Sequence, residues 1–290
     1  LGGVCQAAGA DPTRGDGRMM AAPSPVLRWR PSPFVRGSMV LHAAALMAVL
    51  AHPAVWPWAL GALIANHVAL ALAGLLPRCQ WLGSNWTRLP AAAAARGEIA
   101  LTIDDGPDPS VTPAVLDLLE RHGASATFFC IGTQAARYPA LCREIVRRGH
   151  AIENHSQTHG YSFALQGPRG FLRELRTAQQ TLAAITGQTP QFFRAPAGLR
   201  NPFLDPVLQR LGLQLASWSR RAYDTRNGNA QAVLRILTRS LKAGDILCRH
   251  DRYVALTADV APVILEVLPP LLAAITQAGL RCVTLRAALA

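Results

Sequence analysis

The chain has 290 residues, of which 50% are hydrophobic and only 16% are charged. This hydrophobic fraction is high for a soluble enzyme and indicates that part of the chain lies in lipid. The length allows one large domain with an appendage, or two small domains. The formal charge of +12 comes mostly from arginine and fits nucleic acid, an anionic membrane surface or a phosphorylated substrate. Because the arginines are scattered and no nucleic-acid-binding signature occurs, we favour the membrane surface and expect no nucleic-acid partner.

The six cysteines form neither a CxxC pair nor a spacing typical of a zinc knuckle or a disulfide framework. We interpret them as small core residues, because a buried thiol behaves as a hydrophobic group. They leave the redox compartment undetermined.

Residues 1–38 are rich in Gly, Pro, Ala and Arg without apolar periodicity, which predicts a disordered basic tail. The chain begins with Leu and carries a Met19-Met20 pair. We therefore expect the natural start at one of these two methionines.

Residues 39–76 contain no Lys, Arg, Asp or Glu. The stretch is nearly twice the roughly 20 residues that one membrane-spanning helix needs, and His52-Pro53 interrupts it. A helical hairpin fits this length, and the alternative is a single span over residues 58–76 after an interfacial or signal-like helix. For the polar side chains inside the zone we expect hydrogen bonds between helices. These side chains are His42, His52, Asn66 and His67.

Arginines flank the apolar zone on both sides, and residues 77–97 read as a linker with an alanine run. The positive-inside rule favours cytoplasmic flanks, so the sequence predicts a membrane-anchored protein with a cytoplasmic C-terminal domain.

From residue 98 onward, short apolar runs alternate with amphipathic stretches, which predicts an α/β domain over residues 98–290. Seven alternations in this length favour a parallel, distorted (β/α) barrel of about seven strands, with reactive residues at the C-terminal strand ends. The predicted strands are 99–103, 126–131, 151–153, 191–194, 214–218, 245–248 and 281–285. The predicted helices are 112–122, 134–148, 168–186, 203–211, 229–242 and 259–278.

The first predicted strand ends on two adjacent acids, Asp104 and Asp105, followed by Gly106-Pro107. Neighbours on an extended chain face opposite ways, so two acids that serve one site require the backbone to leave the strand there. Two acids with two roles is one hypothesis. The alternative is that both only cap the next helix.

Two histidines, His155 and His159, follow the third predicted strand. One helical turn would bring both rings to one face. Together with a carboxylate from the first strand they make a two-His, one-carboxylate set, which leaves open positions on a divalent metal. This is the arrangement of a catalytic metal site.

Four segments, taken together, resemble a known family in order and spacing. They are Asp-Asp-Gly-Pro at 104–107, His-Ser-Gln-Thr-His at 155–159, Arg-Ala-Pro-Ala-Gly at 194–198 and His-Asp at 250–251. The set is similar to the polysaccharide deacetylases of the NodB-homology group, carbohydrate esterase family four. The resemblance covers roughly residues 98–286.

The resemblance implies a role for each matching residue. Asp105, His155 and His159 would be the metal ligands, and the metal is usually zinc in this family. Asp104 would be the general base that activates water, which agrees with the chemistry of a carboxylate beside a metal.

It further implies that Arg194 orients that base and that the backbone N–H of Ala197 helps to hold the oxyanion. His250 would be the general acid that protonates the leaving amine. Because it must be cationic to do so, a nearby carboxylate is expected.

Four positions, Ala197, Arg221, Thr225 and Cys248, depart from the family pattern. Ala197 stands where an aromatic residue is usual, which predicts looser packing over the substrate. Cys248 replaces a leucine two residues before His250, which predicts a slightly larger acyl pocket.

A further motif of the family, which lies between the third and the last of these segments and usually holds two Asp and a Trp, is reduced to residues 221–225. Asp224 remains and would pair with His250 or Arg194, while Arg221 replaces the other acid and would attract an anionic substrate.

Together these features predict a membrane-anchored, metal-dependent hydrolase that removes an N-linked acetyl group from an amino-sugar glycan. One alternative is a deformylase or deacetylase of a polyprenyl-phosphate-linked sugar, with Arg220 and Arg221 contacting the phosphate. Another is a catalytically inactive glycan-binding domain.

Overall fold

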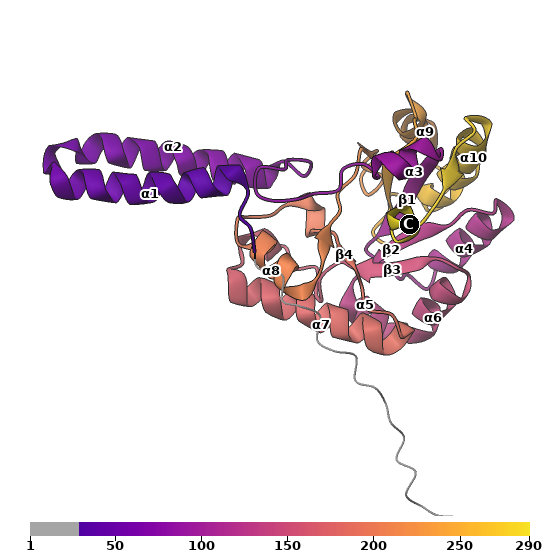
Figure 1. The fold of residues 1–290 in the computed structure, drawn as a ribbon. Coiled ribbons are helices and arrows are strands. Elements are labelled where there is room, and N and C mark those ends of the chain that lie inside the picture. Colours follow the sequence, from indigo (N-terminus) through magenta and orange to yellow (C-terminus); the bar gives the residue numbers. More distant parts are fainter. Residues whose placement is uncertain (1–28) are drawn as a thin grey trace, which may run out of the picture.

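The protein has two parts, a long helical hairpin and an α/β domain from which the hairpin projects (Figure 1). They are seen in a computed structural model that describes residues 29–290. The predicted disorder of residues 1–28 and the proposed start at Met19 or Met20 lie outside the described residues.

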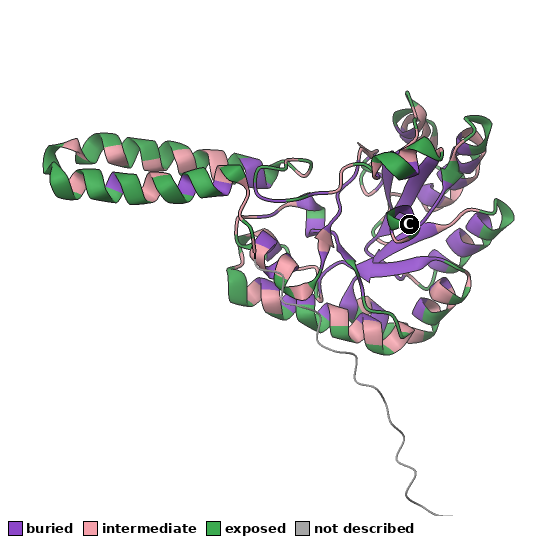
Figure 2. Cartoon of the chain, in the orientation of Figure 1, coloured by how far each residue is buried: buried purple, intermediate pink, exposed green. Residues whose placement is uncertain are grey.

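The hairpin consists of α1 (Pro33–Ala51) and α2 (Trp56–Leu75), joined by the single turn η1 (Pro53–Val55). Each arm is long and apolar enough to cross a membrane. Only 11% of the residues in the apolar stretch of each arm are buried. Figure 2 shows exposed residues along both helices. Two helices are therefore present, as the hairpin interpretation predicts.

The start of α1 corrects one predicted boundary. The side chain of Ser32 caps α1 by accepting from the backbone N–H of Val35, so the helix begins at Pro33 and not at Met39. Residues 33–38 belong to the hairpin instead of a disordered tail.

One of the four polar side chains in the hairpin joins the two helices by a hydrogen bond. The amide of Asn66 donates to Ser38 Oγ at 2.8 Å. His42 and His67 instead bond carbonyls of their own helices, and their rings meet edge to face at 5.1 Å. His52 lies at the exposed turn, where it ends α1.

Residues 77–97 are not the free linker that the sequence predicted. Trp86 and Arg88 form single β-bridges to Ala216 and Asp245, and Leu89 lies in the core. The alanine run is the short helix α3 (Ala91–Ala95). This segment is therefore part of the α/β domain.

The domain is built on a parallel sheet in the order β5-β4-β3-β2-β1-β7-β6, with β8 also paired to β1. Among residues 29–290 no ladder joins β5 to β6, so the barrel is open, in agreement with the predicted distorted (β/α) barrel. The strands are β1 (Glu98–Asp104), β2 (Ala126–Cys130), β3 (Ala151–Asn154), β4 (Phe192–Phe193), β5 (Gln214–Leu215), β6 (Arg220–Arg221), β7 (Ile246–His250) and β8 (Arg281–Cys282).

Seven helices surround the sheet. They are α4 (Thr112–Arg121), α5 (Gly132–Arg137), α6 (Pro139–Arg147), α7 (Pro168–Thr186), α8 (Leu204–Leu211), α9 (Ala230–Thr238) and α10 (Val263–Gln277). The single helix predicted over 134–148 is two helices, because Pro139 has no backbone N–H to continue α5.

Strand β1 is the centre of the core, and all seven of its residues are buried. Ile99, Leu101 and Ile103 pack in the large cluster with α4 and α10, while Ala100 faces a second cluster that includes Phe129. A strand buried on both faces reads as a continuous apolar run, which explains why the sequence located it well. Its last residue, Asp104, lies at the C-terminal edge of the sheet, between the ends of β2 and β7.

Candidate active site

The site forms at the C-terminal edge of the sheet, where β3, β2, β1 and β7 end in this order. In the register of the sheet, Asp104 pairs with His250 on β7 and with Phe129 on β2. His155 directly follows β3. The C-terminal edge of the sheet thus brings together the acids of one motif and the histidines of two others.

Asp104 and Asp105 share this site because the backbone turns between them. Asp105 has φ of 76°, a left-handed conformation that is uncommon for a residue other than glycine. At this turn, successive side chains no longer point to opposite faces of the sheet, as they do along the strand. Helix α4 begins after Val111 without a side-chain cap, so the alternative in which the two acids cap that helix is wrong.

The first group of candidate metal ligands is Asp105, His155 and His159. Asp105 Oδ1 lies 3.1 Å from His155 Nε2 and 3.2 Å from His159 Nε2. His155 Nδ1 donates to the carbonyl of Arg194 at 2.8 Å, so Nε2 turns its lone pair toward the carboxylate. Two acceptors that face each other at this distance need a shared proton or cation, and the donor set suits a divalent metal.

The electrostatics of Asp105 agree with a cation site. Burial alone would raise the pKa of Asp105, but hydrogen bonds from His155 and His159 outweigh it and hold the pKa well below its usual range. A cation bound between these groups takes the place of the shared protons.

The two histidines do not lie on a helix, in contrast to the prediction. Residues 155–159 are a loop in which Ser156 and His159 have φ of 63° and 54°. Ser156 Oγ accepts from the backbone N–H of His159 at 3.0 Å. The four-residue spacing indicated the pair correctly, but the geometry that joins the rings is that of a tight loop.

Arg194 fixes the second acid. Its Nη1 donates to Asp104 Oδ1 and to Thr102 Oγ1, both at 2.6 Å. Its Nε and Nη2 donate to the carbonyls of Ala216 and Ser217. With only 1% of its surface exposed, this guanidinium is locked in place, and it leaves Asp104 Oδ2 to accept a weak hydrogen bond from Cys248 Sγ at 3.4 Å.

His250 has the carboxylate partner that a cationic imidazole needs. Asp224 accepts from its backbone N–H at 2.9 Å and from Nδ1 at 2.8 Å. Burial alone would lower the pKa of His250, but the hydrogen bond to Asp224 outweighs it and the net pKa is raised. Burial would raise the pKa of Asp224, yet the charge of Arg249 and the bond to His250 lower it.

The four remaining candidates differ in their availability. Ala197 and Arg221 line a cavity of about 670 Å³ above the metal ligands. Cys248 is buried beneath it, with Sγ 3.4 Å from Asp104 Oδ2. Arg220 is not free for a phosphate, because its Nε is ion-paired with Asp245 at 2.6 Å and both of its other nitrogens donate to backbone carbonyls.

Arg221 is held differently from its neighbour. Its guanidinium lies over the rings of Trp218 and Tyr223, at 4.8 and 5.3 Å from their centroids. Stacking leaves the edge of the planar group available to a ligand.

The sequence did not indicate several residues that shape the cavity. Trp218 lines the cavity beside Arg221, and Tyr161 and Tyr253 come from two loops. Aromatic residues in loops after strand ends were the available signal, since such rings often pack on sugars. Thr102 was hidden inside a buried strand.

The comparisons with known proteins place the chain in a family. The sequence matches the family described as polysaccharide deacetylase over residues 92–216. A peptidoglycan-N-acetylglucosamine deacetylase of Bacillus cereus is 34% identical over 155 residues, which are 53% of this chain and 72% of the relative. A chitooligosaccharide deacetylase of Azorhizobium caulinodans is 36% identical over 159 residues, which are 54% of this chain and 74% of the relative.

A solved structure agrees. The family 4 carbohydrate esterase of Streptomyces lividans in complex with acetate superposes with a TM-score of 0.58 at 32% identity, over 64% of this chain and 91% of that chain. The chain belongs to the polysaccharide deacetylases, the NodB-homology group of carbohydrate esterase family four.

Proposed function

We propose that the α/β domain removes the acetyl group from an N-acetylated amino sugar of a glycan, using a divalent metal, zinc first, held by Asp105, His155 and His159. One observation carries the proposal. A single cavity holds this cation site together with a carboxylate fixed by Arg194 and an imidazole fixed by Asp224. A module that only binds glycans needs neither a fixed base nor a fixed acid.

Asp105, His155 and His159 would hold the metal, which would supply a Lewis acid to polarise the amide carbonyl and to lower the pKa of water. Asp104 accepts the proton of the attacking water through Oδ2, while Arg194 holds Oδ1. The new carbon–oxygen bond places charge on the carbonyl oxygen, and we assign the backbone N–H of Ala197 to it. His250 gives the proton on Nε2 to the leaving nitrogen as the carbon–nitrogen bond breaks. The products are acetate and the free amine.

The decisive experiment uses the full chain in detergent micelles with N-acetylated chitooligosaccharides and peptidoglycan fragments. We expect acetate release that a chelator abolishes and zinc restores. Asp104→Asn is expected to lower kcat by about 10²–10⁴-fold while retaining the metal, since general base catalysis contributes that much. Asp117→Asn, an exposed aspartate on α4 outside the site, is the matched control.

Binding of the same glycans without acetate release by the parent protein would support the inactive, glycan-binding alternative. Asp104→Asn would then leave the affinity for the glycan unchanged.

A second cavity favours a second candidate substrate, an acylated sugar carried on a polyprenyl phosphate. This cavity of about 840 Å³ shares Ala197, Trp218 and Arg221 with the first and reaches Leu75 and Leu76 at the end of α2. The second cavity therefore runs from the end of an apolar helix to the residues that it shares with the first cavity, which the candidate metal ligands line. A lipid chain would lie against the helix, and Arg221 would meet the phosphate.

This candidate is tested by comparing one acylated sugar in free and lipid-phosphate-linked form. We expect at least about tenfold higher kcat/KM for the linked form, which corresponds to about 1.4 kcal/mol. Arg221→Ala should remove the preference, while Arg143→Ala on the exposed side of α6 should keep it. Equal rates on both forms in the parent protein would rule out the lipid-linked substrate.

A further inference from the structure

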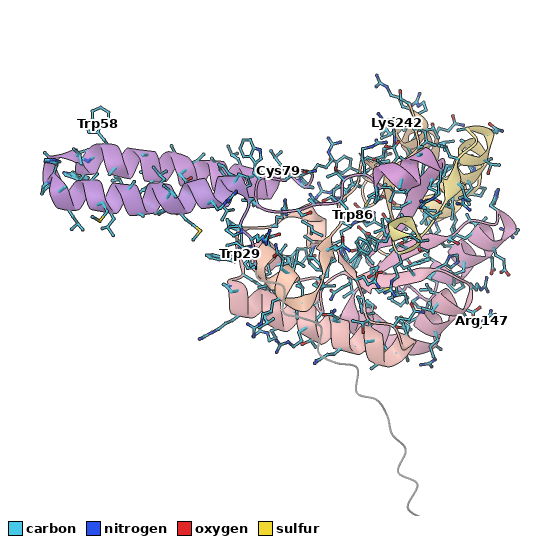
Figure 3. All side chains as sticks on the ribbon, in the orientation of Figure 1. Trp29, Trp58, Cys79, Trp86, Arg147 and Lys242 are labelled. Carbon is cyan, nitrogen blue, oxygen red and sulfur yellow. The ribbon has the colours of Figure 1, made fainter. Side chains whose placement is uncertain are left out.

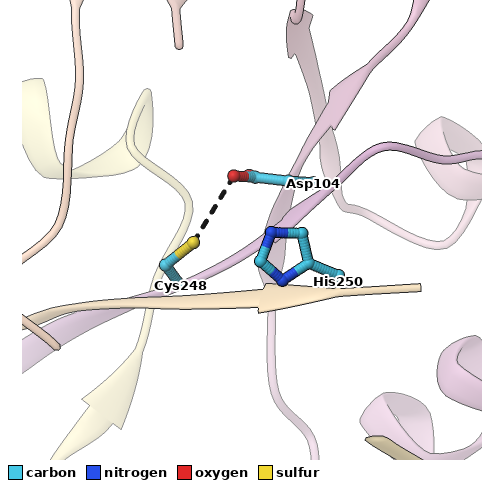
Figure 4. A group of neighbouring side chains, drawn as sticks. All are labelled: Asp104, Cys248 and His250. Atoms are coloured by element: carbon cyan, nitrogen blue, oxygen red, sulfur yellow. Dashed lines mark hydrogen bonds between the residues drawn. The ribbon is translucent and has the colours of Figure 1, made fainter. Parts of the chain in front are cut away.

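A second group of metal-ligating atoms lies beside the first. Asp104, Cys248 and His250 are buried, and their ligating atoms lie within 4.8 Å of one another (Figure 4). Cys248 and His250 are two residues apart on β7, so their side chains share a face. The parallel register then places Asp104 of β1 opposite His250.

The geometry of this group suits a tetrahedral ion. With zinc–sulfur and zinc–oxygen bonds of about 2.3 and 2.0 Å, a tetrahedral angle separates sulfur and oxygen by about 3.5 Å. The thiol of Cys248 donates a hydrogen bond to Asp104 Oδ2 at 3.4 Å, so sulfur and oxygen already stand at this spacing. The oxygen concerned is the one that Arg194 does not bind.

The imidazole of His250 is also oriented for such a role. Its Nδ1 is bonded to Asp224, which leaves Nε2 as the ligating atom. A carboxylate behind a histidine is the usual support of a metal ligand. The sulfur, nitrogen and oxygen together select a thiophilic divalent ion over magnesium or calcium.

We propose that Asp104, Cys248 and His250 form a second, weaker site for zinc or cadmium, whose occupation inhibits the enzyme. Binding exchanges the thiol proton of Cys248, released to solvent, for a sulfur–metal bond. It is weaker than the site at Asp105, because the charge of Arg194 lies against the same carboxylate. Binding of this second ion does not depend on the proposed function. Only the inhibition rests on that function, because the ion would occupy both the proposed base, Asp104, and the proposed acid, His250.

The binding test is a cadmium titration of the full chain in detergent, followed by sulfur-to-cadmium absorbance in the near ultraviolet. Cys5 and the partly buried Cys79 are replaced by Ser, so that neither thiol contributes to the band. We expect two cadmium ions per chain, with the thiolate band arising only during the second equivalent. Cys248→Ala should bind one ion without the band, whereas Cys282→Ala, a buried thiol on β8, should behave as the parent.

The inhibition test compares each variant with itself at equimolar and excess zinc. Acetate release by the parent should fall by about tenfold or more in excess zinc, whereas Cys248→Ala and Cys248→Leu should lose little. Uptake of the first cadmium ion shows that a variant is folded. A parent that binds one ion, or a band that persists in Cys248→Ala, would overturn the proposal. Absence of deacetylation at every zinc level would instead refute the proposed function and leave the cadmium result standing.

Discussion

At the scale of single residues, the site depends on giving two adjacent carboxylates different partners. Asp104 ends a buried strand and is held by Arg194, whereas Asp105 has left the strand and faces two imidazoles. The left-handed backbone at Asp105 is an unfavourable conformation for this residue type, and such strain is often found at functional sites. One acid is thereby free to act as a base while the other can hold a cation.

Arg194 is expected to contribute strongly to stability as well as to catalysis. Arg194→Lys keeps the charge but loses the fork that serves Asp104, Thr102 and two carbonyls, which leaves buried polar groups unpaired. We expect the free energy of unfolding in denaturant to fall by about 3–5 kcal/mol. Arg147→Lys, at an exposed ion pair with Glu144, should leave the free energy of unfolding nearly unchanged. Equal effects of both substitutions would contradict this view of Arg194.

The pair of His250 and Asp224 predicts a pH effect with a definite sign. A general acid works only when protonated, so activity falls as the pH rises through its pKa. Asp224 raises the pKa of His250 against the effect of burial. Asp224→Asn should therefore move the alkaline fall of kcat/KM to lower pH and reduce the maximum by about 10²-fold or more.

Complete pH profiles of the parent, Asp224→Asn and the surface variant Asp117→Asn measure this shift. Asp117→Asn should retain the parent profile. An alkaline fall that stays in place in Asp224→Asn would assign the acid to another group.

At the scale of elements, the sequence located what periodicity controls and missed what tertiary contacts control. The buried strand β1 and the amphipathic helix α7 follow directly from residue patterns. Strand β6 is only Arg220-Arg221, and it exists because both residues pair with β7. The sequence predicted the candidate ligands His155 and His159 but not the conformation of residues 155–159, because hydrogen bonds to neighbouring helices determine that conformation.

Those neighbours are α5 and α7. The backbone N–H groups of Gly132 and Thr133 donate to the carbonyls of Ser156 and Gln157, and Glu174 on α7 accepts from the N–H of Thr158. The first turn of α5 thus carries the metal-ligand loop. The loop conformation therefore depends on how closely α5 approaches α7.

Gly132 lies at a close approach of α5 to α7. A Cβ there would lie 2.0 Å from Gln157 Oε1 and 3.2 Å from the backbone of Ala178 on α7. Overpacking in Gly132→Ala should cost about 1–3 kcal/mol, against a helix-propensity gain of about 1 kcal/mol, so the free energy of unfolding should fall by up to about 2 kcal/mol. The substitution should also weaken zinc binding, measured by competition with a chelating dye. Gly167→Ala, at the N-cap of α7 with nothing within 4 Å of the added atom, should leave zinc binding unchanged.

At the scale of the whole molecule, the hairpin is anchored on the domain. Trp29 Nε1 donates to Asp205 on α8 at 2.8 Å, and the backbone N–H of Arg200 donates to the carbonyl of Gly74 at 3.1 Å. Val35, Ala73 and Leu82 form a small buried cluster at this junction. The base of the hairpin therefore has a fixed position beside the cavity that opens toward Arg221. Its far end carries Trp58, 82% exposed and pointing away from the helices (Figure 3).

This arrangement predicts which residues lie on opposite sides of a membrane. Nineteen residues of α1 rise by about 28 Å, close to the roughly 30 Å of a hydrocarbon core, so the hairpin can cross it twice. Single cysteines are placed by Trp58→Cys at the hairpin tip and Arg147→Cys on the domain, with Cys5 and Cys79 replaced by Ser. An impermeant maleimide added to intact cells should label the tip, and the domain only after permeabilisation, because arginines flank the hairpin base. Labelling of the domain in intact cells with a protected tip would reverse the orientation. Equal labelling of both positions in intact cells would show that the hairpin lies on the membrane and does not cross it.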